Sequence, residues 1–391
     1  MNNFFRATLT AACGLMLATG FTACSDDDET TDGTFSTKEQ ALQAAAVPYV
    51  DNTVLPTYKT MADEAIRLYE KCLDIRDKFN RRTLAEADIR EAGEYWKNSR
   101  KSWELSEAFL FGPAATHNID PHIDSWPLDK VAMDALLADI RNGKDWKIDN
   151  HGGYGLLGFH AIEYVLFELT ADGKQSRPHN PANYTAEELT YLVAVAEDLR
   201  NQCVLLEACW AGDDAISDEK QEILAEAELG YGERYGWMMK NAGKPGSLFI
   251  TFQAVAEEII QGCMDIADEV GKTKIGRPHL GSSGNDEDRN YIESPYSLNS
   301  IEDFQDNIRS IRNSYCGTEN GDASISDYVK SVNPTLDTEV RNAIENAIAT
   351  IGQIPEPFKL HAAGQEATAA MNACDALNTS LSKVMVELTK Q

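Results

Sequence analysis

Helical periodicity, interrupted by proline- and glycine-rich breakers, is the feature that most constrains the fold of this 391-residue chain. In almost every long segment, apolar residues recur at the spacing of one face of an α-helix. Helices are expected near residues 38–48, 57–78, 84–110, 128–141, 155–168, 186–209, 217–240, 248–269, 300–315, 335–351 and 362–389. Because no segment shows the convincing alternation typical of a strand, the sequence predicts an all-α protein.

Two capping-box patterns mark expected helix starts. Thr83 is followed three residues later by Glu86, and Thr185 by Glu188, which predicts helices that open near residues 84 and 186. The segment 271–295 is polar and glycine-rich instead, which is typical of a long mobile loop.

A faint internal repeat divides the chain. Residues 72–75 (Cys-Leu-Asp-Ile) recur as residues 263–266 (Cys-Met-Asp-Ile), and an aromatic-x-x-Asn-x-Arg pattern also occurs once in each half. This predicts two helical-bundle halves, 35–212 and 213–391, related by duplication. Chance resemblance between amphipathic helices is the alternative.

The formal net charge of -28 limits the classes of partner. It argues against nucleic acid, since phosphate binding needs clustered Lys and Arg. It also argues against electrostatic docking on an anionic membrane surface. The charge is compatible with cationic ligands, and its plainer interpretation is solubility outside the cell.

The N-terminus has the features of a targeting segment. Arg6 precedes an apolar stretch, 9–21, which is too short to span a bilayer comfortably. Small residues before Cys24 resemble a bacterial lipobox, so we expect a signal peptide over 1–24, lipidation of Cys24 and an acidic tether over 25–34. The acidic run after Cys24 also resembles the surface-export signal of Bacteroidetes lipoproteins. An ordinary signal peptide and a merely solvated tether are the alternatives.

Six further cysteines follow the leader and lie within helical patterns. No CxxC pair is present, so buried free thiols are the favoured interpretation, although the sequence leaves their pairing open. They are Cys72, Cys203, Cys209, Cys263, Cys316 and Cys374.

His160 and Glu163 form the main functional clue. They lie three residues apart on one stripe of an otherwise apolar helix, after the glycine-rich lead-in that ends at Gly158. A glutamate in such a place is costly unless it is paired or bound to metal. Imidazole suits zinc and iron, and carboxylate suits harder ions, so both side chains could reach one ion. A core His–Glu hydrogen bond without a ligand is the alternative.

The helix expected over 84–110 supplies a second group of charges. A seven-residue repeat marks its buried seam, at Ile89, Trp96, Trp103 and Leu110. Arg100 and Glu107 border this seam, and Glu104 lies one turn from Arg100. Since Glu107 has no evident local partner, it is a candidate ligand for the His160 site. A purely structural salt-bridge cluster is the alternative.

The loop after Gly112 is rich in oxygen ligands and imidazoles, and such loops can bind cations. It offers His117, Asp120, His122, Asp124 and Asp129. Asp129 could instead charge the first turn of the next helix. Trp126 is expected to anchor the loop.

At these residues the chain resembles imelysin-like proteins, the group also known as the M75 peptidase family. Gly158, His160 and Glu163 match the G-x-H-x-x-E motif of that family, and residues 103–129 are also similar to it. The second half has no H-x-x-E, so one site is expected. The segment does not match the H-E-x-x-H zinc peptidase pattern, and neither a general base nor a third metal ligand is evident.

The resemblance implies an all-helical fold of two bundle-like halves with the motif near their junction. It also implies a role in bacterial iron uptake. Together with the lipobox at Cys24, this leads us to expect a metal-binding lipoprotein of the bacterial outer membrane. The expected ligand is iron or an iron-containing molecule, with zinc as the other metal and haem still open; envelope iron-uptake components are the expected partners. The protein is expected to contact the membrane only through its lipid anchor. The alternatives are a zinc metallopeptidase and a binding lipoprotein in which the His–Glu pair is structural.

Overall fold

Helices joined by turns and short 3₁₀ segments account for the fold. The computed structural model describes residues 37–170, 173–281, 283–318 and 321–390. Over these residues there is no β-strand, only an isolated antiparallel bridge between Leu169 and Ser176. The all-α prediction is therefore confirmed. The predicted signal peptide, Cys24 and the acidic tether all lie outside the described residues.

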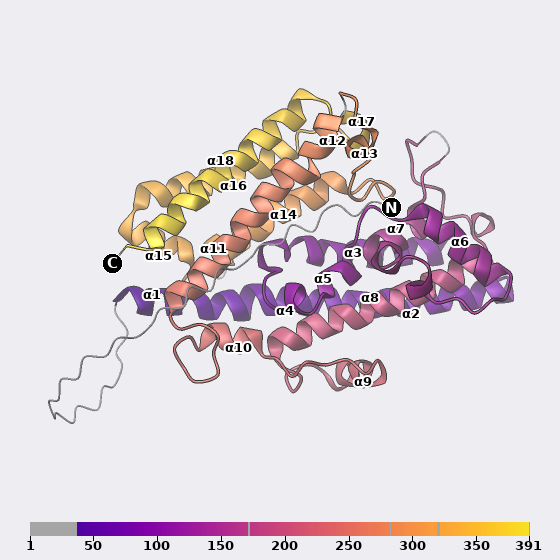
Figure 1. Ribbon diagram of the computed structural model, residues 1–391, viewed down its shortest axis with the longest axis horizontal. Coiled ribbons are helices and arrows are strands. Elements are labelled where there is room, and N and C mark those ends of the chain that lie inside the picture. Colours follow the sequence, from indigo (N-terminus) through magenta and orange to yellow (C-terminus); the bar gives the residue numbers. More distant parts are fainter. Residues whose placement is uncertain (1–36, 171–172, 282, 319–320, 391) are drawn as a thin grey trace, which may run out of the picture. The chain divides into compact units, whose positions relative to one another are not determined.

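The first bundle is built around α2 (Leu55–Arg81) and α8 (Ala186–Ala211), which pack against each other (Figure 1). Helix α3 (Glu86–Glu104) packs on α2, and α6 (Lys130–Arg141) and α7 (Gly158–Phe167) pack on α8. The short helices α4 (Pro113–Thr116) and α5 (Ile119–Ile123) also contact α8. Its core is rich in fully buried aromatic side chains, which bury large areas each: Tyr58, Trp96, Trp103, Tyr191 and Trp210.

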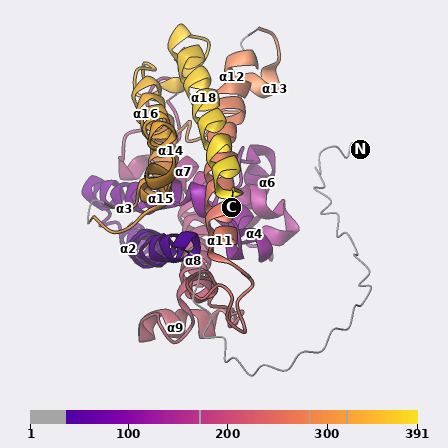
Figure 2. The same ribbon diagram turned by 90° about the vertical axis from the view of Figure 1, so that its left-hand side faces the viewer.

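The second bundle consists of four longer helices that lie side by side (Figure 2). They are α11 (Phe252–Glu269), α14 (Ser300–Cys316), α16 (Pro334–Ile351) and α18 (Gln365–Leu388). Helix α15 (Ile325–Val332) closes one end against α16, and α1 (Thr37–Pro48) packs on α11 and α15. Short connecting elements include η1 (Tyr49–Val54), η3 (Ile148–Asn150), η4 (Gly153–Leu156), η5 (Pro181–Asn183) and α17 (Phe358–His361).

The two bundles meet where α3 and the following 3₁₀ turn, η2 (Glu107–Phe109), contact α11 and α14. The change of bundle comes later in the chain than residue 212. Both α9 (Asp218–Glu226) and α10 (Tyr235–Lys240) still pack on α8 of the first bundle. The first helix of the chain, α1, contacts the second bundle. Duplication of the halves stays a prediction.

Helix boundaries depend on local hydrogen bonds that periodicity does not reveal. Helix α3 ends at Glu104 rather than near 110, because the chain turns there and Ser106 donates from both N–H and Oγ to the Trp103 carbonyl (2.7 Å each). Its start is capped by Asp88, which accepts from the Ala85 N–H (3.1 Å), and not by the predicted Thr83 box. The box at Thr185 is confirmed, with both of its hydrogen bonds present.

The segment 271–295 corrects the expectation of a long loop. It contains most of η6 (Val270–Lys274) and all of α12 (Gly276–Gly281) and α13 (Asp286–Arg289). Lys274 and Glu293 are almost completely buried, at 1% and 0% exposure. These two charges can be buried because they form ion pairs with side chains of the first bundle. The sequence of the segment alone does not reveal such distant partners.

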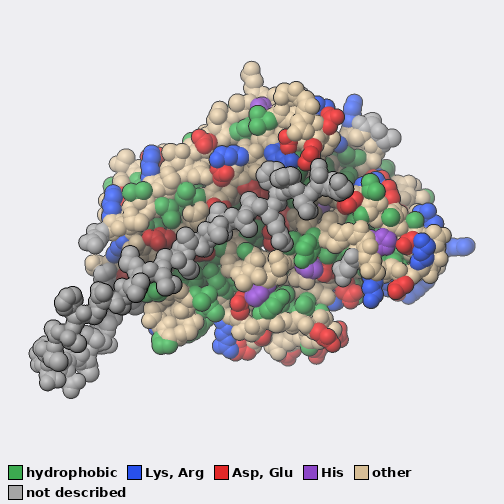
Figure 3. Space-filling model, in the orientation of Figure 1, with side chains coloured by type: hydrophobic (Ala, Val, Ile, Leu, Met, Phe, Trp, Pro, Cys, Tyr) green, Lys and Arg blue, Asp and Glu red, His purple; other side chains and the backbone are tan. Residues whose placement is uncertain are grey.

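The surface in Figure 3 intersperses acidic, basic and apolar side chains over the face that is drawn. Among the described residues, no helix combines the length and apolar character needed to cross a membrane. The six described cysteines are free, and five of them are buried.

Candidate metal centre

Gly158 lets α7 begin in direct contact with the end of α5. Its φ of +74° lies in the left-handed region that favours glycine, and a Cβ there would stand 2.2 Å from the Ile123 carbonyl oxygen. Asp124 follows Ile123 directly, and His160 lies in the first turn of α7. The glycine thus allows the close approach that brings Asp124 and His160 together.

His160 is held between two carboxylates. Its Nδ1 lies 3.1 Å from Glu163 Oε2, and its Nε2 lies 3.2 Å from Asp124 Oδ1. Burial lowers the pKa of His160, but the neighbouring carboxylates of Asp124 and Glu163 outweigh that effect and raise the pKa to about 9. The ring therefore carries a proton on both nitrogens unless a metal ion displaces one of them.

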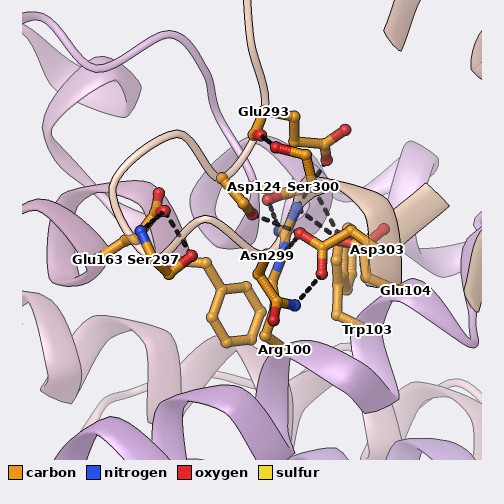
Figure 4. Close-up of polar contacts among 12 residues, drawn as sticks. Arg100, Trp103, Glu104, Asp124, Glu163, Glu293, Ser297, Asn299, Ser300 and Asp303 are labelled. Carbon is orange, nitrogen blue, oxygen red and sulfur yellow. Dashed lines mark hydrogen bonds and ion pairs between the residues drawn. The ribbon is translucent and has the colours of Figure 1, made fainter. Parts of the chain in front are cut away.

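Glu163 orients His160 and does not point with it at one ion. Its Oε1 accepts hydrogen bonds from the Tyr296 N–H (3.0 Å), the Ser297 N–H (2.7 Å) and the Ser297 hydroxyl (2.7 Å). Figure 4 shows Glu163 and Ser297 apart from the charged group around Arg100. The expectation that both motif side chains are ligands stays a prediction; in the structure the Glu163 carboxylate is hydrogen-bonded to the 296–297 backbone and to His160.

Arg100 lies at the centre of the charged group and is completely buried (Figure 4). Its guanidinium, which donates in several fixed directions, pairs with four carboxylates. They are Glu104 (2.5 Å), Glu293 (2.6 Å), Asp303 (3.4 Å) and Asp124. The predicted Arg100–Glu104 pair is present, but it belongs to a larger network that reaches the second bundle.

Asp124 connects Arg100 to His160. Its second oxygen, Oδ2, accepts from the Trp103 indole N–H at 2.8 Å. Burial raises the pKa of Asp124, but the positive charges of Arg100 and His160 outweigh that effect, and the pKa falls well below the usual range. Asp124 is therefore an ionised carboxylate in the protein interior, beside the imidazole.

Lys274 is the second buried cation of the group. Its Nζ lies 3.2 Å from Glu107 Oε1, 3.2 Å from Glu293 Oε1 and 3.8 Å from Glu104 Oε2. Sequence reasoning missed Lys274, Glu293 and Asp303. The sequence pointed to Lys274 and Glu293 only indirectly. Arg100 and Glu107 were expected near the core, and their own helix did not supply enough partners for their charges.

Two sets of potential ligand atoms converge here. One atom each from Asp124, His160 and Glu293 lie within 4.8 Å of one another, and the same holds for Glu104, Glu107, Asp124 and Glu293. Glu293 Oε2 has no hydrogen-bond partner in the described part of the chain, and His160 Nε2 has only its ion-pair contact with Asp124 Oδ1 at 3.2 Å. Buried polar atoms without a hydrogen bond destabilise the folded state, and a bound cation would satisfy them. The set of ligand atoms therefore fits a cation.

The charges of the group do not balance. Six buried carboxylates face three cationic side chains: Glu104, Glu107, Asp124, Glu163, Glu293 and Asp303 against Arg100, His160 and Lys274. Burial accordingly raises the pKa of Glu104 and Glu107, and that of Asp303 to about 6. Protons compensate part of the buried charge, and a metal ion could replace them.

With this geometry in place, comparison with known proteins identifies the family. The peptidase M75 family model, described as imelysin, matches residues 54–384. The chain belongs to the imelysin family. This confirms the expected resemblance to imelysin-like proteins.

Two relatives have names that refer to iron. The chain is 27% identical over 327 residues to iron-regulated protein A of Synechococcus elongatus, covering 83% of this chain and 79% of that protein. It is also similar to a crystal structure named for an iron-regulated protein A precursor from Parabacteroides distasonis. There the identity is 28% and the TM-score 0.76, with 92% of this chain and 97% of that chain covered.

An imelysin-like protein from Psychrobacter arcticum shares the fold at 14% identity. The TM-score is 0.55, and the match covers 90% of this chain and 94% of that chain.

An acid-lined pocket borders the centre of this imelysin-family chain. Its volume is about 400 Å³, and the carboxylates among its lining residues are Glu107, Asp120, Glu258, Asp265 and Glu269. Burial raises the pKa of Asp120 to about 7, with the nearby charge of Asp124 adding to the effect. Glu107 belongs both to this pocket and to the four-acid set, so the pocket borders the buried carboxylates.

The other predicted loop residues lie outside the two ligand sets. Asp129 caps α6 by accepting from the Ala132 N–H at 2.9 Å. Trp126 packs on Tyr291, with ring centroids 3.9 Å apart. Asp129 and Trp126 thus both make contacts that stabilise the local structure.

Proposed function

We propose that this imelysin-family protein binds iron at the centre formed by Asp124, His160 and Glu293, with Glu104 and Glu107 beside it. The observation that carries the proposal is the convergence of ligand atoms from Asp124, His160 and Glu293 within 4.8 Å of one another, where Glu293 Oε2 has no hydrogen-bond partner in the described part of the chain. The excess of buried negative charge and the names of the two relatives support it.

The chemistry of the ligand set favours iron over zinc. One imidazole accompanied by several carboxylates is rich in hard oxygen ligands, which suit ferric iron, and zinc is the competing ion. A bare ion also fits better than haem. His160 is only 2% exposed, whereas an axial ligand to haem must stand at the wall of a cavity that admits the flat ring.

The cellular role follows from the same proposal. A lipid on Cys24 would hold the protein at the bacterial outer membrane, and the bound iron would be passed to or received from envelope iron-uptake components. The acidic pocket beside Glu107 would collect the cation from solution.

Calorimetric titration of the purified chain with iron tests the proposal. We expect wild type to bind iron and His160→Ala and Glu293→Gln to bind at least about tenfold more weakly, because each loses a ligand. Glu207→Gln is the matched control: it removes another buried carboxylate, paired with Lys220, away from the centre. Equal iron binding by wild type and both site variants would sink the proposal, and so would the absence of binding to wild type. Elemental analysis of protein from its native envelope then identifies the metal.

A further inference from the structure

A second group of metal-ligating side chains lies outside the centre and has no part in the proposed iron binding. His117 follows α4, Cys209 lies in the last turn of α8, and Glu233 precedes α10. One ligand atom of each lies within 4.8 Å of the other two. His117 Nε2 and Glu233 Oε2 are 3.0 Å apart.

The group is built like a site that opens to the surface. Cys209 is 1% exposed and forms its floor, while the side chains of His117 and Glu233 are 15% and 30% exposed. The ring of Tyr231 stacks on the His117 imidazole, with centroids 3.6 Å apart and planes at 7°. Such stacking fixes the plane of the imidazole, as outer contacts do for metal ligands in general.

The donor types differ from those of the iron centre. A thiolate, an imidazole and a carboxylate are ligands that Zn²⁺ accepts together, and three protein ligands leave a fourth position for water or an incoming group. The sulfur makes the set softer than the carboxylate-rich group around Arg100, so it favours a different ion.

We propose that His117, Cys209 and Glu233 form a second cation site, which binds a borderline divalent ion such as Zn²⁺ independently of the centre at His160. Binding forms bonds from the ion to Nε2, Sγ and a carboxylate oxygen. The thiol proton of Cys209 passes to the solvent, and no redox change accompanies the step.

A surface ion pair between His117 and Glu233 is the competing interpretation. The chain contains a matched example without a sulfur ligand: His122 Nδ1 lies 3.1 Å from Asp198 Oδ2 at similar exposure. His122→Ala therefore removes a His–carboxylate pair of the same kind and leaves the proposed site intact.

The experiment uses the full chain and Co²⁺ as a spectroscopic probe for the Zn²⁺ site. We expect wild type to show a thiolate-to-cobalt charge-transfer band that added Zn²⁺ abolishes. Cys209→Ser should lose the band, and His117→Ala and Glu233→Gln should weaken Co²⁺ binding at least about tenfold. His122→Ala and His160→Ala should both retain the band, which separates this site from the iron centre.

Site-resolved alkylation gives a second measurement that does not depend on spectra. Zn²⁺ should protect Cys209 from alkylation in wild type and in His160→Ala, but not in Glu233→Gln. If Cys209→Ser fails to fold, the two surface variants decide the matter. No charge-transfer band in wild type, or a band that survives His117→Ala and Glu233→Gln unchanged, would overturn the proposal.

Discussion

Glu163 and Glu293 are both completely buried, but the structure gives them different tasks. The Oε1 atom of Glu163 accepts hydrogen bonds from Tyr296 and Ser297, and its Oε2 atom is hydrogen-bonded to His160. Glu293 contacts Arg100 and Lys274 through Oε1 and leaves Oε2 without a hydrogen bond. We therefore propose a positioning role for Glu163 and a ligand role for Glu293.

This difference predicts two distinct spectroscopic outcomes. Glu163→Gln should weaken iron binding about 10- to 100-fold while the spectrum of the bound ion stays that of wild type, because the ligand atoms are unchanged. Glu293→Gln should change the spectrum itself, since it alters a ligand. Electron paramagnetic resonance of the ferric protein measures both. An altered spectrum in Glu163→Gln would contradict the positioning role.

Arg100 holds the network together even without a metal ion. Arg100→Met removes the guanidinium shared by four buried carboxylates, and breaking a buried ion pair costs about 3–5 kcal/mol. We expect the free energy of unfolding, measured by urea denaturation with a chelator present, to fall by that amount. Arg90→Met on the same helix is the control, because its exposed pair with Glu86 contributes at most about 1 kcal/mol. Equal losses in both variants would contradict this assignment.

Individual site residues differed in how far the sequence could reveal them. His160, Glu163 and Arg100 were predictable, because a charge on an apolar helical stripe must have a partner. Lys274 and Glu293 were not, since their polar, glycine-rich segment shows no periodicity and their partners lie more than a hundred residues away in the chain.

At the scale of elements, α7 is positioned by its first residue. Gly158 combines a positive φ with a contact that leaves no room for a Cβ against Ile123. Most helix spans followed from periodicity, whereas the end of α3 and the helices within 271–295 depended on side-chain hydrogen bonds and distant ion pairs.

Gly158→Ala should therefore disturb both the helix and the metal centre. Left-handed strain costs about 1–2 kcal/mol, and displacement of the α5 end adds to it, so we expect the free energy of unfolding to fall by about 3 kcal/mol. Iron affinity should fall as well, because His160 moves away from Asp124. Gly153→Ala is the matched control: its φ is +61° but its Cβ would meet nothing within 4 Å. In Gly153→Ala the free energy of unfolding should fall by about 1 kcal/mol, and the iron affinity should stay that of wild type. Normal affinity in Gly158→Ala, by titration, would refute the argument.

At the scale of the whole molecule, the proposed ligand set includes residues of both bundles. Asp124 and His160 come from the first bundle, and Glu293 lies in the segment between α13 and α14 of the second. The H-x-x-E motif and the acidic loop after Gly112 could predict only the residues of the first bundle. The convergence of Glu293 with them depends on how α3 and η2 pack against α11 and α14, which no local pattern encodes.

An ion bound between the bundles should stabilise both of them together. At a free iron concentration 100 times the dissociation constant, binding to the folded state adds about 2.7 kcal/mol to the free energy of unfolding. Hydrogen exchange should slow in the first turn of α7 and around residues 293–297 in the same titration. Glu293→Gln should lose both effects, because the ion then has no ligand from the second bundle, while Glu207→Gln should keep them. Protection confined to α7 would mean that the ion is held by the first bundle alone, and the bridging role of Glu293 would be wrong.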